Sequence, residues 1–186
     1  MLIKQLPNCI TVIRIIGTVL LFFIPPLSIS FYVVYSICGI SDVADGFIAR
    51  KMKTTSSFGA KLDSIADLLF YAVMLYRIFP ILWRKLPGWI WYVVAGILIL
   101  RFCSYLVAAL KYKRFASLHT YLNKLTGFMI FSVPYLLDLP IIVAFCIGVC
   151  VVAAIASGEE LFLHLSSKEY DPTQKTLLCR MQTKKT

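Results

Sequence analysis

The residues that point most directly to chemistry are four aspartates within a stretch of 26 residues. Asp42 and Asp45 are three residues apart and Asp63 and Asp67 are four apart, so each pair projects from one face of a helix. The apolar segments that carry the two pairs are joined by a short loop, which predicts antiparallel neighbours with both pairs at similar depth. Four carboxylates that converge away from water cannot all stay ionised without cations. Hard divalent ions such as Mg²⁺ or Mn²⁺ are the cations that these oxygen ligands favour.

Small residues lie beside these acids. Gly46 and Ala49 follow Asp42 by four and seven residues and share its helical stripe, and Gly59 lies at the turn into the next segment. Such residues either let two membrane helices pack closely or leave room for a ligand, and their place around the acids favours a ligand. Arg50 follows directly. Its guanidinium offers a planar fork for phosphate oxygens, although a positive charge there would also fit the cytoplasmic side of a membrane.

The segments that carry these residues are typical of a membrane protein. Of the 186 residues, 60% are hydrophobic, whereas soluble domains average about 45–50% apolar residues. Six stretches approach the roughly 20 apolar residues that a helix needs to cross a bilayer. They are Ile10–Ile29, Phe31–Ile48, Leu62–Ile81, Pro87–Leu110, Tyr121–Leu137 and Leu139–Ser157. We therefore predict an all-α fold of six transmembrane helices within one domain, residues 1–160, followed by a basic cytoplasmic tail, residues 161–186.

The positive charges predict the orientation of these segments. With both termini in the cytoplasm, the outer loops carry only Arg77, Arg84 and Lys85, and the other loop and tail charges face the cytoplasm. This asymmetry favours both ends inside and places the acids near the cytoplasmic face, between the second and third helices. The net charge of +10 then reflects topology and anionic lipid headgroups. A nucleic-acid partner is not expected, because no basic soluble domain is present to bind one.

The acidic stretch resembles the signature of the CDP-alcohol phosphotransferase family, D-x-x-D-G-x-x-A-R-x8-G-x-x-x-D-x-x-x-D. Every fixed position matches, through Asp42, Asp45, Gly46, Ala49, Arg50, Gly59, Asp63 and Asp67. The start of the chain, from Pro7-Asn8 through Ile10-Thr11 to Arg14, is similar to the P-N-x-I-T-x-x-R opening of phosphatidylglycerophosphate and cardiolipin synthases. The resemblance in layout covers about the first 160 residues.

This resemblance implies transfer of a phosphatidyl group from CDP-diacylglycerol to a small alcohol, with release of CMP. It implies two divalent ions, Mg²⁺ or Mn²⁺, bound by Asp42, Asp45 and Asp63. It also implies that Asp67 is the general base and that this carboxylate contacts a metal as well. The nucleotide-binding residues by the same correspondence are Asp42, Gly46, Ala49, Arg50 and Gly59. A homodimer is also implied.

A second set of polar residues is a candidate for binding the acceptor alcohol. Arg101 falls inside an apolar segment, where a charge is costly, so it should face the helix bundle. There it faces a phosphate on the acceptor or an acidic structural partner, or it snorkels to the interface. Asn123, Lys124 and Thr126 form a polar patch at the start of the next apolar segment. The patch fits either acceptor contacts or an ordinary interfacial helix start.

The identity of the acceptor rests on conflicting signals. Synthases that use glycerol 3-phosphate often read L-D-P-x-A-D-K, and a later G-K-x-K-T block of theirs is not cleanly present here. This chain reads Leu62-Asp63-Ser64-Ile65-Ala66-Asp67-Leu68. Its Ser64 is more similar to phosphatidylserine or inositol-phosphate synthases, whereas the opening motif favours glycerol 3-phosphate. We predict glycerol 3-phosphate as the acceptor, with serine or an inositol phosphate as the alternative.

A different functional class is a membrane cation transporter that uses the four acids as an ion path. The acids cluster near one face and do not thread the bilayer, which favours the enzyme. A protein of the same fold without activity, serving as a membrane assembly partner, is a third reading, and the presence of all four acids argues against it.

Two histidines and two glutamates near the ends of the apolar segments are expected to have structural roles. His119 and His164 lie far apart at the ends of spans and are expected at the membrane interface. Glu159 and Glu160 follow the sixth span and are expected to form a solvated helix end.

Overall fold

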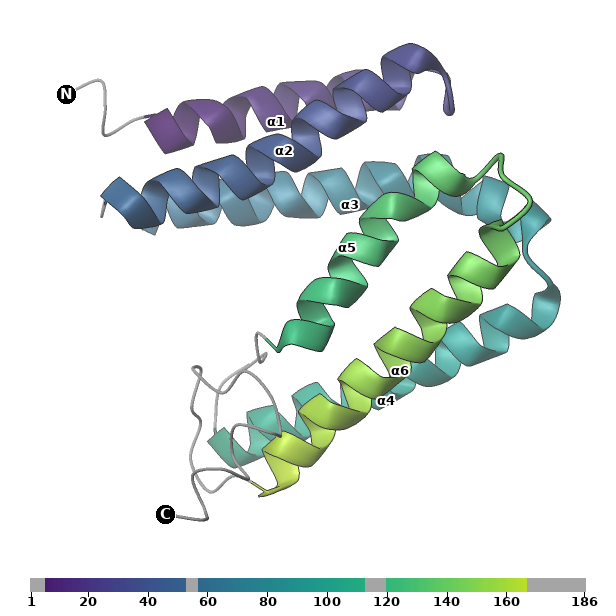
Figure 1. Cartoon of the computed structure of the whole chain (residues 1–186). Helices are drawn as coiled ribbons and strands as arrows, with labels where there is room; N and C mark the ends of the chain where they lie inside the picture. The colour runs from purple at the N-terminus through teal and green to yellow at the C-terminus, as the bar shows by residue number, and fades with distance from the viewer. Residues whose placement is uncertain (1–5, 53–56, 113–119, 167–186) are drawn as a thin grey trace. The chain divides into compact units, whose positions relative to one another are not determined.

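The computed structural model describes residues 6–52, 57–112 and 120–166, and these ranges contain helices and no strands. In chain order the helices are α1 (Leu6–Phe23), α2 (Ile29–Met52), α3 (Ser57–Lys85), α4 (Gly88–Tyr112), α5 (Tyr121–Leu136) and α6 (Ile142–Ser166), as Figure 1 shows. The all-α fold class predicted from the sequence is confirmed. His119 lies outside the described ranges. Residues 167–186, which form most of the predicted basic tail, also lie outside them.

Three of the described helices are long and apolar enough to cross a membrane, namely Lys61–Lys85 within α3, and α4 and α6. Each has 25 residues, which at about 1.5 Å per residue exceeds the roughly 30 Å of a bilayer's hydrocarbon core. α1 and α2 contain shorter apolar stretches, Cys9–Phe23 and Ile29–Asp42. The length and composition of the described helices therefore support three of the six predicted spans, and the other three stay predictions.

The chain divides into two compact units, Met1–Arg84 and Lys85–Thr186. In the first unit α1 packs against α2 (Figure 1). Pro25 and Pro26 follow α1 and lack the N–H groups that would continue it. The Ser28 hydroxyl then accepts a hydrogen bond from the Phe31 N–H at 3.2 Å and donates one to the Pro25 carbonyl at 2.8 Å. This cap starts α2 in the direction that returns it along α1.

Gly17 brings α1 and α2 into close contact. A Cβ atom added at this glycine would lie 2.7 Å from the sulfur of Cys38, which is buried on α2. That separation is far shorter than a normal contact between carbon and sulfur, so any larger residue would force the helices apart or twist the Cys38 side chain.

We expect Gly17→Ala to lower the stability of the protein by about 1–2 kcal/mol, because overpacking at Cys38 outweighs the gain in helix propensity. The measurement is the thermal unfolding midpoint of the purified protein in detergent. Gly96→Ala on α4 is the matched control, since nothing lies within 4 Å of a Cβ added there. A Gly17→Ala midpoint at or above that of Gly96→Ala would contradict the close contact.

α3 is an antiparallel neighbour of α2, as the short loop between them predicted. Tyr35 stacks on Phe70 with ring centroids 5.6 Å apart, and farther along α2 the carboxylate of Asp42 lies near that of Asp63, which is earlier on α3. The far end of α3 reaches α1, where the Arg77 guanidinium donates to the Ile24 carbonyl just after the helix ends. α3 therefore contacts both α1 and α2.

In the second unit α4 and α5 both pack against α6. The buried apolar residues include Ile90, Ala108, Val133, Leu137, Cys146, Ala156 and Leu163. The Lys111 ammonium donates to the carbonyls of His164 and Leu165, each at 2.9 Å, and so satisfies acceptors that the last turn of α6 leaves open. This contact ties the end of α4 to the end of α6.

Candidate functional site

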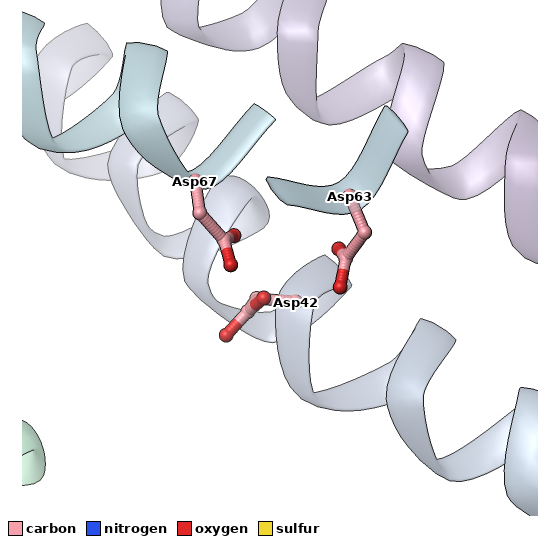
Figure 2. A group of neighbouring side chains, drawn as sticks. All are labelled: Asp42, Asp63 and Asp67. Atoms are coloured by element: carbon pink, nitrogen blue, oxygen red, sulfur yellow. The ribbon is translucent and has the colours of Figure 1, made fainter. Parts of the chain in front are cut away.

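Three of the four aspartates converge in the first unit. Asp42 comes from α2, and Asp63 and Asp67 come from successive turns near the start of α3. Their carboxylates point toward one another (Figure 2), and one oxygen of each lies within 4.8 Å of the other two. The side chains are about half exposed, with 53% for Asp42, 45% for Asp63 and 42% for Asp67. The predicted convergence of acids from neighbouring helices is confirmed for these three, and a ligand can reach them.

The structure does not describe the side chains of most other residues that were predicted to bind the nucleotide or the metals. Asp45, Gly46, Ala49 and Arg50 belong to α2, but their side chains lie outside the described part of the chain. Gly59 is half-buried in the first turns of α3, one turn before Asp63. The roles of these residues therefore stay predictions.

Arg14 also belongs to this site, although the sequence analysis assigned no catalytic or binding role to it. It lies on α1 with 2% of its side chain exposed, and its Nη1 atom is 2.8 Å from Asp42 Oδ1, 3.1 Å from Asp63 Oδ1 and 2.6 Å from Asp67 Oδ1. A guanidinium on one helix thus binds carboxylates on two others. Two features of the sequence could have identified it: a charge inside an apolar segment, and its place as the last fixed residue of the opening motif.

A second polar cluster lies in the other unit and joins three helices. Arg101 on α4 donates from Nη2 to Asn123 Oδ1 on α5 at 3.2 Å, and the Asn123 amide donates to Glu160 Oε2 on α6 at 3.2 Å. The same Glu160 oxygen is 3.9 Å from Arg101 Nη2. The Thr120 hydroxyl caps α5 by accepting from the Asn123 backbone N–H at 3.2 Å, which fixes where the helix starts.

The four predicted acceptor residues are therefore only partly brought together. Arg101 and Asn123 are hydrogen-bonded to each other, and Arg101 has the acidic partner that was one of its predicted alternatives. Lys124 is exposed on α5. Thr126 is buried, and its hydroxyl donates to the Leu122 carbonyl within the same helix at 2.8 Å.

One expectation about the end of the last span is wrong, because Glu160 is fully buried and not solvated. His164 is 1% exposed and therefore packs against protein, and its position at the membrane interface stays a prediction. Both residues are buried because α6 continues to Ser166, past the predicted end of the span at Ser157, so both stay on the packed face of the helix. They lie one turn apart, with His164 Nε2 3.8 Å from Glu160 Oε1.

Comparison with known proteins decides the family. The family model described as CDP-alcohol phosphatidyltransferase matches residues 4–158, which is most of the chain. The chain belongs to this family. The resemblance drawn from the acidic motif is confirmed, and the cation transporter considered as an alternative finds no support in the match.

The individual relatives that the chain resembles differ in the acceptor they are named for. The chain is 33% identical over 92 residues to a CDP-diacylglycerol--glycerol-3-phosphate 3-phosphatidyltransferase of Wigglesworthia glossinidia brevipalpis (45% of this chain, 50% of the relative). It is 35% identical over 92 residues to the enzyme of that name from Pseudomonas fluorescens (45% and 47%). A CDP-diacylglycerol--inositol 3-phosphatidyltransferase of Candida albicans is 32% identical over 88 residues (44% and 38%).

These matches are partial, and no solved structure matches the chain. The chain spans about half the length of the curated relatives that it matches first. Family membership therefore rests on the family model and on the motif.

The three carboxylates of this family member fit a divalent cation. Their oxygens are hard donors, and they are half exposed, so water can complete a coordination shell. Oxygens at about 2.1 Å from one Mg²⁺ are at most about 4.2 Å apart, and those of Asp42, Asp63 and Asp67 lie within 4.8 Å of one another. Small side-chain adjustments are enough to close this difference. The presence of Arg14 Nη1 among them shows that the site already attracts positive charge.

Proposed function

We propose that this protein transfers a phosphatidyl group from CDP-diacylglycerol to glycerol 3-phosphate and releases CMP. The observation that carries the proposal is the convergence of Asp42, Asp63 and Asp67 within 4.8 Å, from two helices, in a chain that belongs to this family. The names of the relatives from Wigglesworthia and Pseudomonas favour glycerol 3-phosphate as the acceptor.

In the proposed reaction, the hydroxyl oxygen of the acceptor attacks the phosphorus that bears the diacylglycerol. The bond from that phosphorus to the bridging oxygen of CMP breaks, and CMP leaves with the electron pair. Asp67 takes the proton of the attacking hydroxyl, because a carboxylate within reach is an adequate general base. Asp42, Asp45, Asp63 and Asp67 hold two divalent ions, Mg²⁺ or Mn²⁺. When bound, these ions neutralise the pyrophosphate and stabilise both the attacking and the leaving oxygen.

The remaining predicted residues bind the two substrates in this proposal. Gly46, Ala49 and Gly59 leave space for the nucleotide beside Asp42, and Arg50 donates to its phosphates. Arg101 binds the phosphate of the acceptor, with Asn123, Lys124 and Thr126 as further acceptor contacts. Arg101 suits this role because the guanidinium has five N–H donors, and its described hydrogen bonds to Tyr105 and Asn123 come from Nε and Nη2, which leaves Nη1 for a ligand.

The proposed setting is a membrane, which the apolar helices and the family favour. Both termini face the cytoplasm, and the aspartates lie near that face, because the positive charges are concentrated on that side. A homodimer is proposed on family resemblance.

The proposal is tested by CMP release from CDP-diacylglycerol by the purified protein with Mg²⁺ or Mn²⁺. Glycerol 3-phosphate, serine, inositol and inositol phosphate are supplied one at a time. We expect release with glycerol 3-phosphate alone, and none in EDTA. Release only with inositol or its phosphate would instead support the acceptor class favoured by Ser64 and by the Candida relative. A folded protein inert with all four acceptors and both metals would contradict the proposed reaction.

A further inference from the structure

Arg14 lies at the centre of the three carboxylates, and this position carries a consequence for cation binding. Its Nη1 atom is 2.6–3.1 Å from one oxygen each of Asp42, Asp63 and Asp67, which belong to two other helices. The carboxylates are half exposed, whereas the arginine is buried, so the guanidinium reaches them from the interior of the helix packing. A cation arriving from outside therefore meets a positive charge already in place.

The charges of the described groups explain why an arginine is stable there. Three carboxylates that converge at the edge of a membrane domain repel one another strongly when no cation is near. A buried guanidinium is equally costly unless it is paired with acids. Each group thus compensates the other, so Arg14 is a counterion that the protein itself supplies to these three carboxylates.

The same geometry sets Arg14 against a divalent ion. An ion coordinated at about 2.1 Å by oxygens of these carboxylates would occupy the space that Nη1 now fills. A guanidinium nitrogen and a doubly charged cation at that separation repel each other and compete for the same lone pairs. The two states of the site are therefore mutually exclusive at these oxygens.

We propose that Arg14 is the internal counterion of the metal-free site, and that a divalent cation binds Asp42, Asp63 and Asp67 only by displacing the Arg14 guanidinium from them. This inference rests on the proposed function to the extent that these acids bind a divalent cation, and it adds how that binding is controlled. The arginine stabilises the empty protein and weakens its affinity for the cation. Both effects have the same origin and must change together.

The test compares Arg14→Gln with the wild type in two measurements that do not require turnover. The first is the thermal unfolding midpoint in EDTA and in saturating Mn²⁺, and the second is the Kd of Mn²⁺ from electron paramagnetic resonance of the free ion. We expect Arg14→Gln to unfold at a lower temperature in EDTA and to recover most of the difference in Mn²⁺. We expect its Kd for Mn²⁺ to fall about 10-fold or more, which is within the usual range of coupling between sites.

Arg77→Gln is the matched control. Arg77 is a half-buried arginine of the same unit, and it donates to the Ile24 carbonyl. Its loss should lower the midpoint equally with and without Mn²⁺ and leave the Kd unchanged. Arg14→Lys keeps the positive charge but lacks the planar guanidinium. Its Kd for Mn²⁺ should therefore lie between those of the wild type and Arg14→Gln.

The outcomes separate this inference from the proposed function. A wild type that binds Mn²⁺ together with an Arg14→Gln Kd that is unchanged or higher overturns the inference and leaves the proposed reaction standing. A wild type that binds no divalent cation overturns both. If Arg14→Gln folds only in Mn²⁺, the inference is supported. If Arg14→Gln folds neither in EDTA nor in Mn²⁺, the Kd of Arg14→Lys for Mn²⁺ is the test. An Arg14→Lys Kd equal to that of the wild type overturns the inference.

Discussion

Replacing Asp67 with Asn is expected to reduce CMP release from CDP-diacylglycerol by about 100-fold or more. A positioned general base contributes about 10²–10⁴ to a rate, and the amide cannot accept the proton of the acceptor hydroxyl. The change also removes one of the three carboxylates that lie within 4.8 Å of one another, so cation binding should weaken as well. The measurement is the initial rate of CMP release at saturating Mg²⁺ and both substrates.

Asp138→Asn is the control for this experiment. Asp138 is an exposed acid of the other unit that pairs with Lys85 at 2.8 Å, far in sequence from the motif, so its rate should stay near that of the wild type. The two rates are compared only if thermal unfolding shows that both variants are folded. An Asp67→Asn rate within a few-fold of wild type would remove Asp67 as the base.

Replacing Arg101 with Gln is expected to lower kcat/KM for glycerol 3-phosphate by about 10- to 100-fold, mainly through KM. Hydrogen bonds to charged groups contribute about 1.5–3 kcal/mol each, and a neutral amide cannot replace the fork that a phosphate accepts. The measurement is the dependence of CMP release on the concentration of glycerol 3-phosphate at fixed CDP-diacylglycerol.

Arg84→Gln, an exposed arginine near the end of α3, is the control and should keep the wild-type KM. Arg101 also lies 3.9 Å from the buried Glu160, so its loss should lower the thermal midpoint whatever its role in binding. A lower midpoint with an unchanged KM would limit Arg101 to that structural pairing.

The convergence of the acids could be predicted because it depends on local spacing. Positions three or four apart share a helix face, and a short loop makes adjacent helices antiparallel, so Asp42 had to lie near Asp63 and Asp67. The family motif then added the expected chemistry. The prediction of this convergence did not require knowing which other helix packs against α2 and α3.

What the sequence did not predict depends on packing between helices that are distant along the chain. Arg14 reaches Asp63 and Asp67 from α1, and its partners are 49 and 53 residues away. The sequence analysis expects Glu160 to be solvated because the hydropathy of the last span falls before the helix itself ends at Ser166. Burial of a polar residue beyond an apolar run is decided by its partners, here Asn123 and Arg101, and these lie on other helices.

The contact between Gly17 and Cys38 also gives the protein a native probe of its own motion. Cys38 is 1% exposed and its sulfur lies close to Gly17 of α1, so an alkylating reagent can reach it only when α1 and α2 separate. Cys9 and Cys103 are exposed, so their modification does not depend on separation of α1 and α2. The rate at which Cys38 becomes modified therefore reports the frequency of opening between the helix that carries Arg14 and the helix that carries Asp42.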